Sequence, residues 1–115
     1  MNNYELMALN QALFYIRFNC IDPNTVNIKC SDFLVDAHLK ILNELEKFYI
    51  IEGISVNYDG FIEDQSGNYM PSIISTIRNI EDWKELTQEN KLELIKSLAS
   101  PYKIKHETIE SLMSF

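Results

Sequence analysis

The stretch Ser31-Asp-Phe-Leu-Val-Asp-Ala-His-Leu-Lys-Ile-Leu-Asn-Glu-Leu-Glu-Lys-Phe-Tyr49 indicates the fold class, because its apolar side chains recur at helical spacing. Ser31 or Asp32 is placed to cap this helix, since a short polar side chain there accepts a hydrogen bond from a free amide of the first turn. The predicted buried seam consists of Leu34, Ala37, Ile41, Leu45 and Phe48, with Leu42 and Tyr49 beside it. Gly53 marks the end of the helix or the start of a turn, although residues 48–56 are rich enough in β-branched and aromatic side chains to be partly extended.

A second apolar pattern precedes this helix. Leucine, isoleucine and phenylalanine side chains at helical spacing predict a mostly buried helix from about Asn3 to Phe18. The segment 22–25, Asp-Pro-Asn-Thr, then breaks the chain, because Pro23 has no amide hydrogen and disfavours helical geometry in the residue before it. We expect a loop or a short extended piece from there to Lys29.

Three further helices are expected in the C-terminal part of the chain. The first is entered at residues 71–72 and carries the isoleucine repeat of residues 73–80. Thr87 caps the second helix, which continues until the Ser-Pro pair at 100–101 stops it. The third covers residues 105–113.

Residues 54–70 are the most loop-like part of the sequence. Asp-Gly at 59–60 and Ser-Gly at 66–67 are turn signals, so this segment forms either a short hairpin or an irregular loop. No repeat and no Pro- or Gly-rich linker divides the chain. We therefore predict a single helical domain over residues 1–115, mainly α, built as an irregular bundle of about five helices.

The composition is that of a globular chain. It has 115 residues, of which 46% are hydrophobic and 23% charged, which is enough to bury a core without metals or disulfides. No signal peptide opens the sequence, and no apolar run approaches the roughly 18 residues that a membrane span needs. These features predict a cytoplasmic protein in which Cys20 and Cys30 are reduced thiols.

Local motifs for catalysis or metal binding are missing from the sequence. His106 opens His-Glu-Thr-Ile-Glu, in which Glu110 replaces the second histidine of a zinc-protease helix. A calcium loop framed on Gly60 has Ser66 where the glutamate of the twelfth position belongs. We expect His38 and His106 to be solvated side chains. We also expect no enzymatic activity, no cofactor and no metal. A catalytic site assembled from residues far apart in the sequence is the open alternative.

Charge is the most informative property of the sequence. Seventeen acidic and ten basic residues give a net charge of −7. Residues 59–93 carry −5 of this charge, with eight acidic residues against Arg78, Lys84 and Lys91, whereas residues 94–115 carry +1. Such a field repels nucleic acid and anionic membranes and attracts basic proteins. We therefore expect a basic protein partner, without direct contact to nucleic acid or membrane.

Aromatic side chains alternate with the acidic residues of this region. Aromatic anchors surrounded by carboxylates suit a surface that holds a basic protein. The candidate partner-binding residues are Tyr58, Asp59, Phe61, Glu63, Asp64, Tyr69, Glu81, Asp82, Trp83 and Glu85. The alternative is that the aromatic side chains cover the core and that the acidic residues form a solvated rim.

In its size, in its charge of −7 and in the stretch Tyr58–Glu85, the chain resembles the immunity proteins that bacteria make against toxins. The resemblance implies a stoichiometric inhibitor whose acidic face docks on the basic cleft of a toxin, commonly a nuclease. The abundance of isoleucine, asparagine and lysine is compatible with a bacterial or phage gene.

Two other functions remain open at this point, as do the oligomeric state and the identity of the partner. A phage-encoded inhibitor or nucleic-acid mimic that blocks a host defence protein requires the same acidity. A self-associating structural or regulatory module requires an apolar face instead, and Phe14, Tyr15 and Phe18 on the first helix are the candidates for it.

Overall fold

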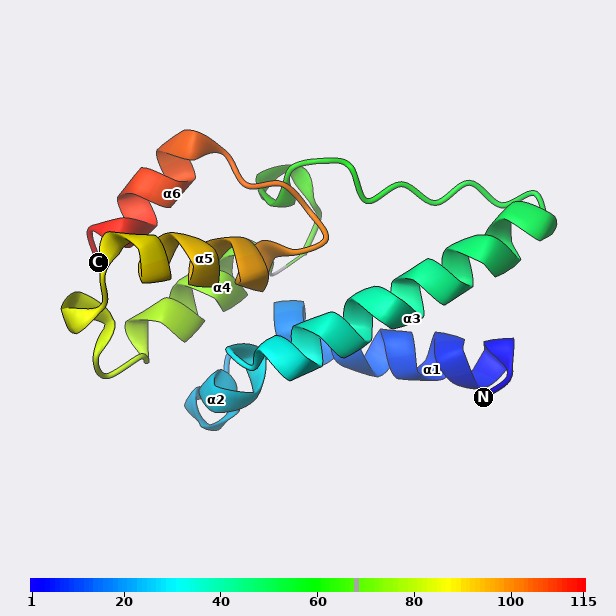
Figure 1. The fold of residues 1–115 in the computed structure, drawn as a ribbon, viewed down its shortest axis with the longest axis horizontal. Helices are drawn as coiled ribbons and strands as arrows, with labels where there is room; N and C mark the ends of the chain where they lie inside the picture. The colour runs from blue at the N-terminus through cyan, green and yellow to red at the C-terminus, as the bar shows by residue number, and fades with distance from the viewer. Residues whose placement is uncertain (68) are drawn as a thin grey trace.

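The computed structural model describes residues 1–67 and 69–115 and confirms a mainly α fold (Figure 1). Six α-helices follow one another within these residues: α1 (Asn3–Phe14), α2 (Val26–Lys29), α3 (Asp32–Ile51), α4 (Tyr69–Arg78), α5 (Gln88–Ala99) and α6 (His106–Met113). The described residues form no strand, and none of the described helices is long and apolar enough to cross a bilayer. The principal dimensions are 46 × 27 × 24 Å.

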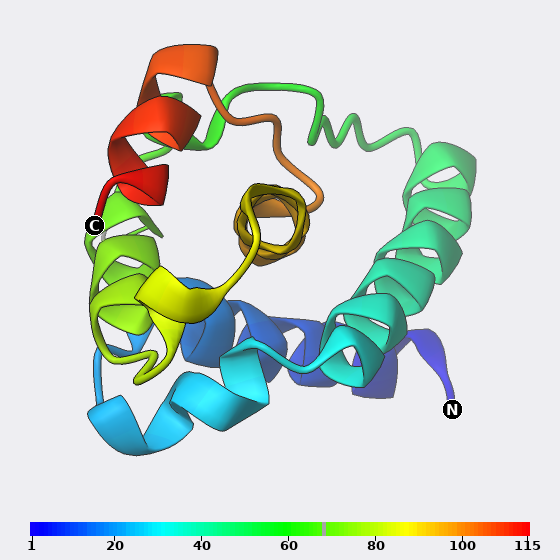
Figure 2. The ribbon, with the colours of Figure 1, turned by 60° about the vertical axis from the view of Figure 1, so that its left-hand side comes forward.

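The other helices surround α5. Figure 2 looks nearly along α5 and shows α4 and α6 to one side of it, α1 and α2 below it and α3 on the opposite side. α1 and α3 contact each other and run in opposite directions, so the start of α1 and the end of α3 lie at the same end of the molecule. This arrangement is the irregular bundle that the sequence predicts, with α2 as an additional short helix.

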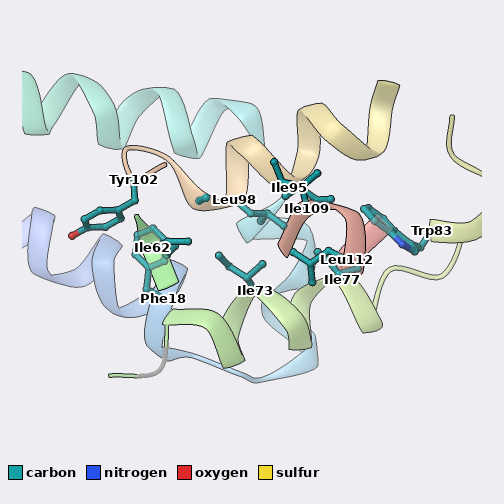
Figure 3. Packing of buried hydrophobic residues seen from close by; sticks show 11 residues of the cluster. Phe18, Ile62, Ile73, Ile77, Trp83, Ile95, Leu98, Tyr102, Ile109 and Leu112 are labelled. Atoms are coloured by element: carbon teal, nitrogen blue, oxygen red, sulfur yellow. The ribbon is translucent and has the colours of Figure 1, made fainter. Parts of the chain in front are cut away.

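Buried hydrophobic side chains from α4, α5 and α6, together with four from the turns and segments between helices, form the main core (Figure 3). Its members are Phe18, Ile62, Ile73, Ile77, Trp83, Ile95, Leu98, Ala99, Tyr102, Ile109 and Leu112. Trp83 lies at one end of the cluster, and Phe18 and Tyr102 lie at the other end. Four further buried side chains, Leu13, Val35, Leu42 and Leu45, belong to α1 and α3. Removal of this apolar surface from water is the main stabilising contribution to the fold.

α1 begins as predicted and ends in a wider turn, but the prediction that it is mostly buried is wrong, because Leu13 is the only buried residue of Asn3–Phe14. The Asn2 side chain accepts a hydrogen bond from the Glu5 amide at 2.8 Å, and the Glu5 carboxylate accepts one from the Asn2 amide at 3.0 Å, which is a capping box. The helix continues past Phe14, but its last turn, Tyr15–Asn19, is a π-helix. This turn carries Arg17 and Phe18, which are adjacent in sequence and both buried.

Residues 23–29 are helical, which corrects the predicted loop or extended piece. Pro23–Thr25 form a 3-10 turn that continues directly into α2. The Asp22 carboxylate caps this turn by accepting a hydrogen bond from the Asn24 amide at 3.0 Å. A proline that ends one helix also suits the first turn of the next helix. The amides of a first turn have no hydrogen-bond partner within the helix, so the missing amide hydrogen of proline costs nothing there.

α3 begins and ends close to the predicted residues. The Ser31 hydroxyl accepts a hydrogen bond from the Leu34 amide at 3.4 Å, which confirms the predicted cap. The helix ends at Ile51, and Gly53 then adopts a φ of +72°, a left-handed conformation that favours glycine. Residues 48–51 are therefore helical, and the prediction that they are partly extended is wrong.

The buried face of α3 is rotated relative to the predicted seam. Its buried residues are Val35, His38, Leu42 and Leu45, whereas Ala37 is exposed. The prediction was wrong because it assigned His38 to solvent, and the structure encloses this side chain completely. Hydrogen-bond partners inside the molecule make a polar side chain suitable for a buried face.

The three C-terminal helices lie close to their predicted positions, although α4 begins two residues earlier than predicted and ends before Ile80. α4 begins at Tyr69, so Pro71 lies within its first turn, where proline is tolerated. Trp83–Glu85 form a separate 3-10 turn between α4 and α5. The Thr87 hydroxyl caps α5 by accepting a hydrogen bond at 3.1 Å from the amide three residues later, and α5 ends at Ala99.

Of the predicted stretch 54–70, residues 54–67 form a loop with a 3-10 turn at Ile62–Asp64 and not a hairpin, residue 68 lies outside the described residues, and Tyr69 already belongs to α4. The first part of the loop runs back along the molecule from the end of α3 (Figure 1). Phe61 and Lys103 form an isolated parallel bridge. The Lys103 carbonyl accepts a hydrogen bond from the Ile62 amide at 2.8 Å, and the Lys103 amide donates to the Gly60 carbonyl at 3.0 Å. The bridge fastens the loop to the segment between α5 and α6.

Candidate functional site

Arg17 is a buried cation that forms no ion pair with a carboxylate in the described part of the chain. Its guanidinium donates to the carbonyl oxygens of Ser97, Leu98 and Ser100 at 3.2, 3.5 and 2.5 Å. These carbonyls lie at the end of α5, where the helix dipole places partial negative charge. Burial lowers the pKa of Arg17 to about 10, so the side chain is still charged at neutral pH. Arg17 therefore ties the π turn after α1 to the end of α5.

His38 of α3 is the second member of this network. Arg17 Nη1 lies 2.7 Å from His38 Nδ1, and His38 Nε2 lies 2.8 Å from the Asn10 side-chain oxygen. Because arginine only donates, Nδ1 accepts and Nε2 carries the hydrogen, which makes the ring neutral. Burial and the Arg17 charge lower the pKa of His38 to about 4. The network joins α1, α3 and α5 through polar atoms.

Lys29 and Ser72 form a buried pair of a kind that serves as base and nucleophile in some hydrolases. Lys29 Nζ donates to Ser72 Oγ at 3.0 Å and to the Cys20 carbonyl, and Ser72 Oγ donates to the Arg17 carbonyl at 3.1 Å. The two residues are 2% and 0% exposed, so a substrate has no access to either. The pair instead satisfies carbonyl groups at the end of the π turn.

Lys91 of α5 is the third buried cation. Its ammonium group lies 5.5 Å from the centre of the Trp83 ring and donates to the Met113 carbonyl at 3.4 Å. Both contacts place the positive charge against electron-rich groups, the aromatic face and the carbonyl at the end of α6. Neither contact uses a carboxylate.

Burial of these three cations changes the charge of the surface. Seven basic side chains remain there against seventeen carboxylates, none of which is buried, so the surface carries −10 rather than the −7 of the whole chain. In the sequence, Lys91 counts as a neutralising charge among residues 59–93. In the structure its charge lies inside the molecule.

Three of the four predicted aromatic anchors lie in or against the core. Trp83 is only 4% exposed. Tyr69 stacks on Phe18 with ring centres 4.8 Å apart, and Tyr58 is half-buried. Phe61 is 38% exposed and is the one predicted aromatic anchor that faces solvent. Tyr58, Tyr69 and Trp83 therefore cover the core, as the alternative prediction states.

The aromatic side chains proposed for self-association also turn inward. Phe18 is fully buried, and the Phe14 ring packs edge-on against His38 at 4.6 Å between ring centres. Tyr15 is the exposed member of the three. The predicted seam on the first helix therefore offers little apolar area to a second copy.

The predicted acidic residues fall into two groups, one before α5 and one beside the segment that follows it. α5 has 12 residues and so spans about 18 Å. Asp59, Glu63 and Asp64 form the group beside the following segment, and Lys105 contacts Glu63 and Asp64. Glu63 accepts a hydrogen bond from the Lys105 amide at 2.8 Å, and Asp64 lies 3.5 Å from the Lys105 ammonium.

Glu81, Asp82 and Glu85 form the other group, at the turn before α5. All three are exposed, and no ion pair to them occurs in the described part of the chain. Glu89, in the first turn of α5, is also exposed and extends the group, although it is not among the predicted binding residues. Glu81, Asp82, Glu85 and Glu89 together form the acidic ridge.

Two hollows adjoin the acidic ridge. One has a volume of about 570 Å³ and is lined by apolar side chains that include Ile80 and Phe115. The other has a volume of about 780 Å³, extends toward α2 and is lined in part by Val26 and Leu86. Glu81 lines both hollows, so the ridge stands between two partly apolar depressions.

No protein-family model, curated protein or solved structure matches this chain. Among the described residues, no group of three or more His, Cys, Asp and Glu side chains is placed to hold a metal ion.

Proposed function

We propose that this protein is a stoichiometric inhibitor of the immunity class, and that its acidic ridge binds the basic cleft of a toxin. The observation that carries the proposal is the separation of charge. Three cations are buried on carbonyl groups and rings, while the carboxylates of the ridge face solvent without ion pairs among the described residues. The group around Glu63 and Asp64 contributes less, because Lys105 lies against it.

Electrostatics and shape both suit such a partner. An acidic surface steers a basic protein toward it and raises the association rate, an effect that salt screens over about 8–10 Å. A nuclease cleft is basic because it binds phosphates, so its potential complements that of the ridge. The two adjoining hollows supply the apolar area that carboxylates alone lack.

The same ridge suits a phage-encoded inhibitor or nucleic-acid mimic, since a host nuclease presents the same kind of cleft. The identity of the captured protein separates the two functions. We expect tagged protein to capture one basic protein at near-equal stoichiometry from a lysate of the source organism at low salt, and to release it at high salt. Capture of a secreted toxin supports the immunity function, and capture of a defence protein supports the alternative.

Charge reversal tests whether the ridge is the binding surface. The triple variant Glu81→Lys, Asp82→Lys and Glu85→Lys should weaken binding of the captured protein by about a hundredfold, because close charge pairs across an interface contribute one to several kcal/mol each. Binding is measured by titration calorimetry at low salt.

The matched control places the same charge change elsewhere. Glu44→Lys, Glu52→Lys and Glu110→Lys lie on exposed positions outside the ridge and should weaken binding by less than about tenfold. Equal weakening by the two variants would mean that the total charge, and not the acidic ridge, attracts the partner.

A further inference from the structure

A groove separates α3 from the open segment that follows it. Its volume is about 270 Å³, below the usual range for a small-molecule pocket and suited to one long side chain. Leu39 and Leu42 of α3, Val56 of the open segment, Tyr58 and Pro101 line it. None of the lining residues belongs to the acidic ridge, so the groove is a separate surface.

The open segment has free backbone groups beside this groove. In the described structure, residues 55–58 make no hydrogen bond to another backbone group, although Ile54 before them and Gly60 after them do. Extended segments with unpaired amide and carbonyl groups readily pair with a second extended chain. Proteins commonly add a peptide as a strand in this way. The groove is therefore suited to an extended peptide.

The charged residues that line the groove are both acidic. Glu46 of α3 and Asp59 of the open segment belong to its lining, and no lysine or arginine does. The Tyr58 ring lines the same groove as these two carboxylates. Charge complementarity therefore requires an occupant with a positive charge.

We propose that this groove binds an extended segment of a protein partner through one arginine side chain. The guanidinium group lies between Glu46 and Asp59, where it can donate to both carboxylates, and its plane stacks on the Tyr58 ring. The aliphatic part of the arginine packs against the leucine side chains of α3. A lysine ammonium has neither the planar shape nor the forked donors that this geometry rewards. The proposal rests on the groove and is independent of the acidic ridge.

The probe is a short synthetic peptide, acetyl-Gly-Ser-Val-Arg-Val-Ser-Gly-amide, titrated into the full chain while backbone amide NMR shifts are recorded. We expect the shifts to concentrate at Glu46 and residues 55–59. Replacement of the arginine by citrulline, which has nearly the same shape without the charge, should weaken binding at least about tenfold, because charge-assisted hydrogen bonds are lost.

Two matched variants assign the effect to the groove. Glu46→Gln with Asp59→Asn should weaken binding of the arginine peptide by about tenfold. Glu81→Gln with Glu85→Gln removes the same number of charges from the acidic ridge and should change the affinity by less than about twofold. All four positions are exposed, and far-UV circular dichroism verifies that both variants are folded. The proposal is overturned if the citrulline peptide binds equally well, if the shifts concentrate at the acidic ridge, or if the arginine peptide causes no shifts.

Discussion

Between α4, α5 and α6 most buried side chains are isoleucines and leucines that pack in one cluster, whereas between α1, α3 and α5 a hydrogen-bonded network of Arg17, His38 and the half-buried Asn10 lies among buried leucines. The first kind of contact is non-directional and depends on the area removed from water. The second kind depends on hydrogen bonds with fixed geometry and on the protonation of one imidazole ring. The end of the molecule formed by the start of α1 and the end of α3 is poorly covered, since Tyr4 and Ile51 there are 77% and 81% exposed.

This difference indicates that stability is unevenly distributed. We expect the free ends of α1 and α3 to open locally first, because few buried apolar contacts hold them, and α4–α6 to open last. The acidic ridge lies beside the aliphatic half, the part of the molecule formed by α4–α6, where a rigid surface suits rapid electrostatic docking. The groove lies beside α3 on the polar half, the part formed by α1 and α3 with the Arg17–His38 network. Local adjustment there helps a peptide strand to enter.

The largest expected effect comes from truncating one side chain in each half. Leu112→Ala removes a fully buried side chain of α6 from the main core and should lower the free energy of unfolding by about 4 kcal/mol. Leu13→Ala, on the buried side of α1, should cost about 2 kcal/mol, because the outer helices can relax into the space. Urea unfolding followed by far-UV circular dichroism measures both values.

The ratio of these two losses in free energy of unfolding tests whether α1 and α3 are packed less tightly than α4–α6. If Leu13→Ala destabilises the protein as much as Leu112→Ala, then α1 and α3 are packed as tightly as α4–α6, and the expected order of local opening is wrong.

Acid should weaken the polar half, and His38 sets the pH range. The pKa of His38 is about 4 in the folded protein and 6.5 when unperturbed. As the pH falls, the unfolded chain binds this proton first, so the contribution of His38 is complete above pH 6.5 and is lost between pH 6.5 and about pH 4. The linked loss of stability is about 3 kcal/mol by pH 4. Urea titrations at several pH values measure it.

Two histidine variants separate this effect from the titration of carboxylates. His38→Gln removes the linked loss and should flatten the stability profile between pH 6.5 and pH 4, even though it lowers stability at neutral pH. His106→Gln is the control, because His106 is exposed and pairs with Glu110 at the surface. A profile that stays steep in His38→Gln would show that the polar network does not control acid stability.

Much of the helical architecture could be predicted because its signals are local. Ser31 and Thr87 cap α3 and α5 as their positions predict, and the isoleucine repeat of α4 points into the core. The buried face of α3 could not be predicted in the same way. His38 is polar, and only its partners Asn10 and Arg17, which lie about thirty and twenty residues earlier in the chain, make its burial favourable.

The candidate site was less predictable, because it depends on which charges meet in space. Lys105 approaches Glu63 and Asp64 from about forty residues further along the chain, so the acidic stretch divides into a neutralised part and the acidic ridge. The burial of Arg17 and Lys29 had one sequence signal, since each lies directly between two apolar residues. That signal alone does not identify the carbonyl groups that receive them.

The smallest expected effect concerns the helix caps of the two halves. Thr87→Ala removes the cap of α5, around which the other helices pack, and should lower the global free energy of unfolding by about 1 kcal/mol. Asn2→Ala removes a cap of the same kind from the free end of α1 and should accelerate amide exchange in the first turn while the global value changes by less than about 0.5 kcal/mol. Native-state hydrogen exchange measures both quantities in one experiment. If Asn2→Ala lowers protection in α4–α6 as well, the start of α1 unfolds together with the main core, and the two halves form one cooperative unit.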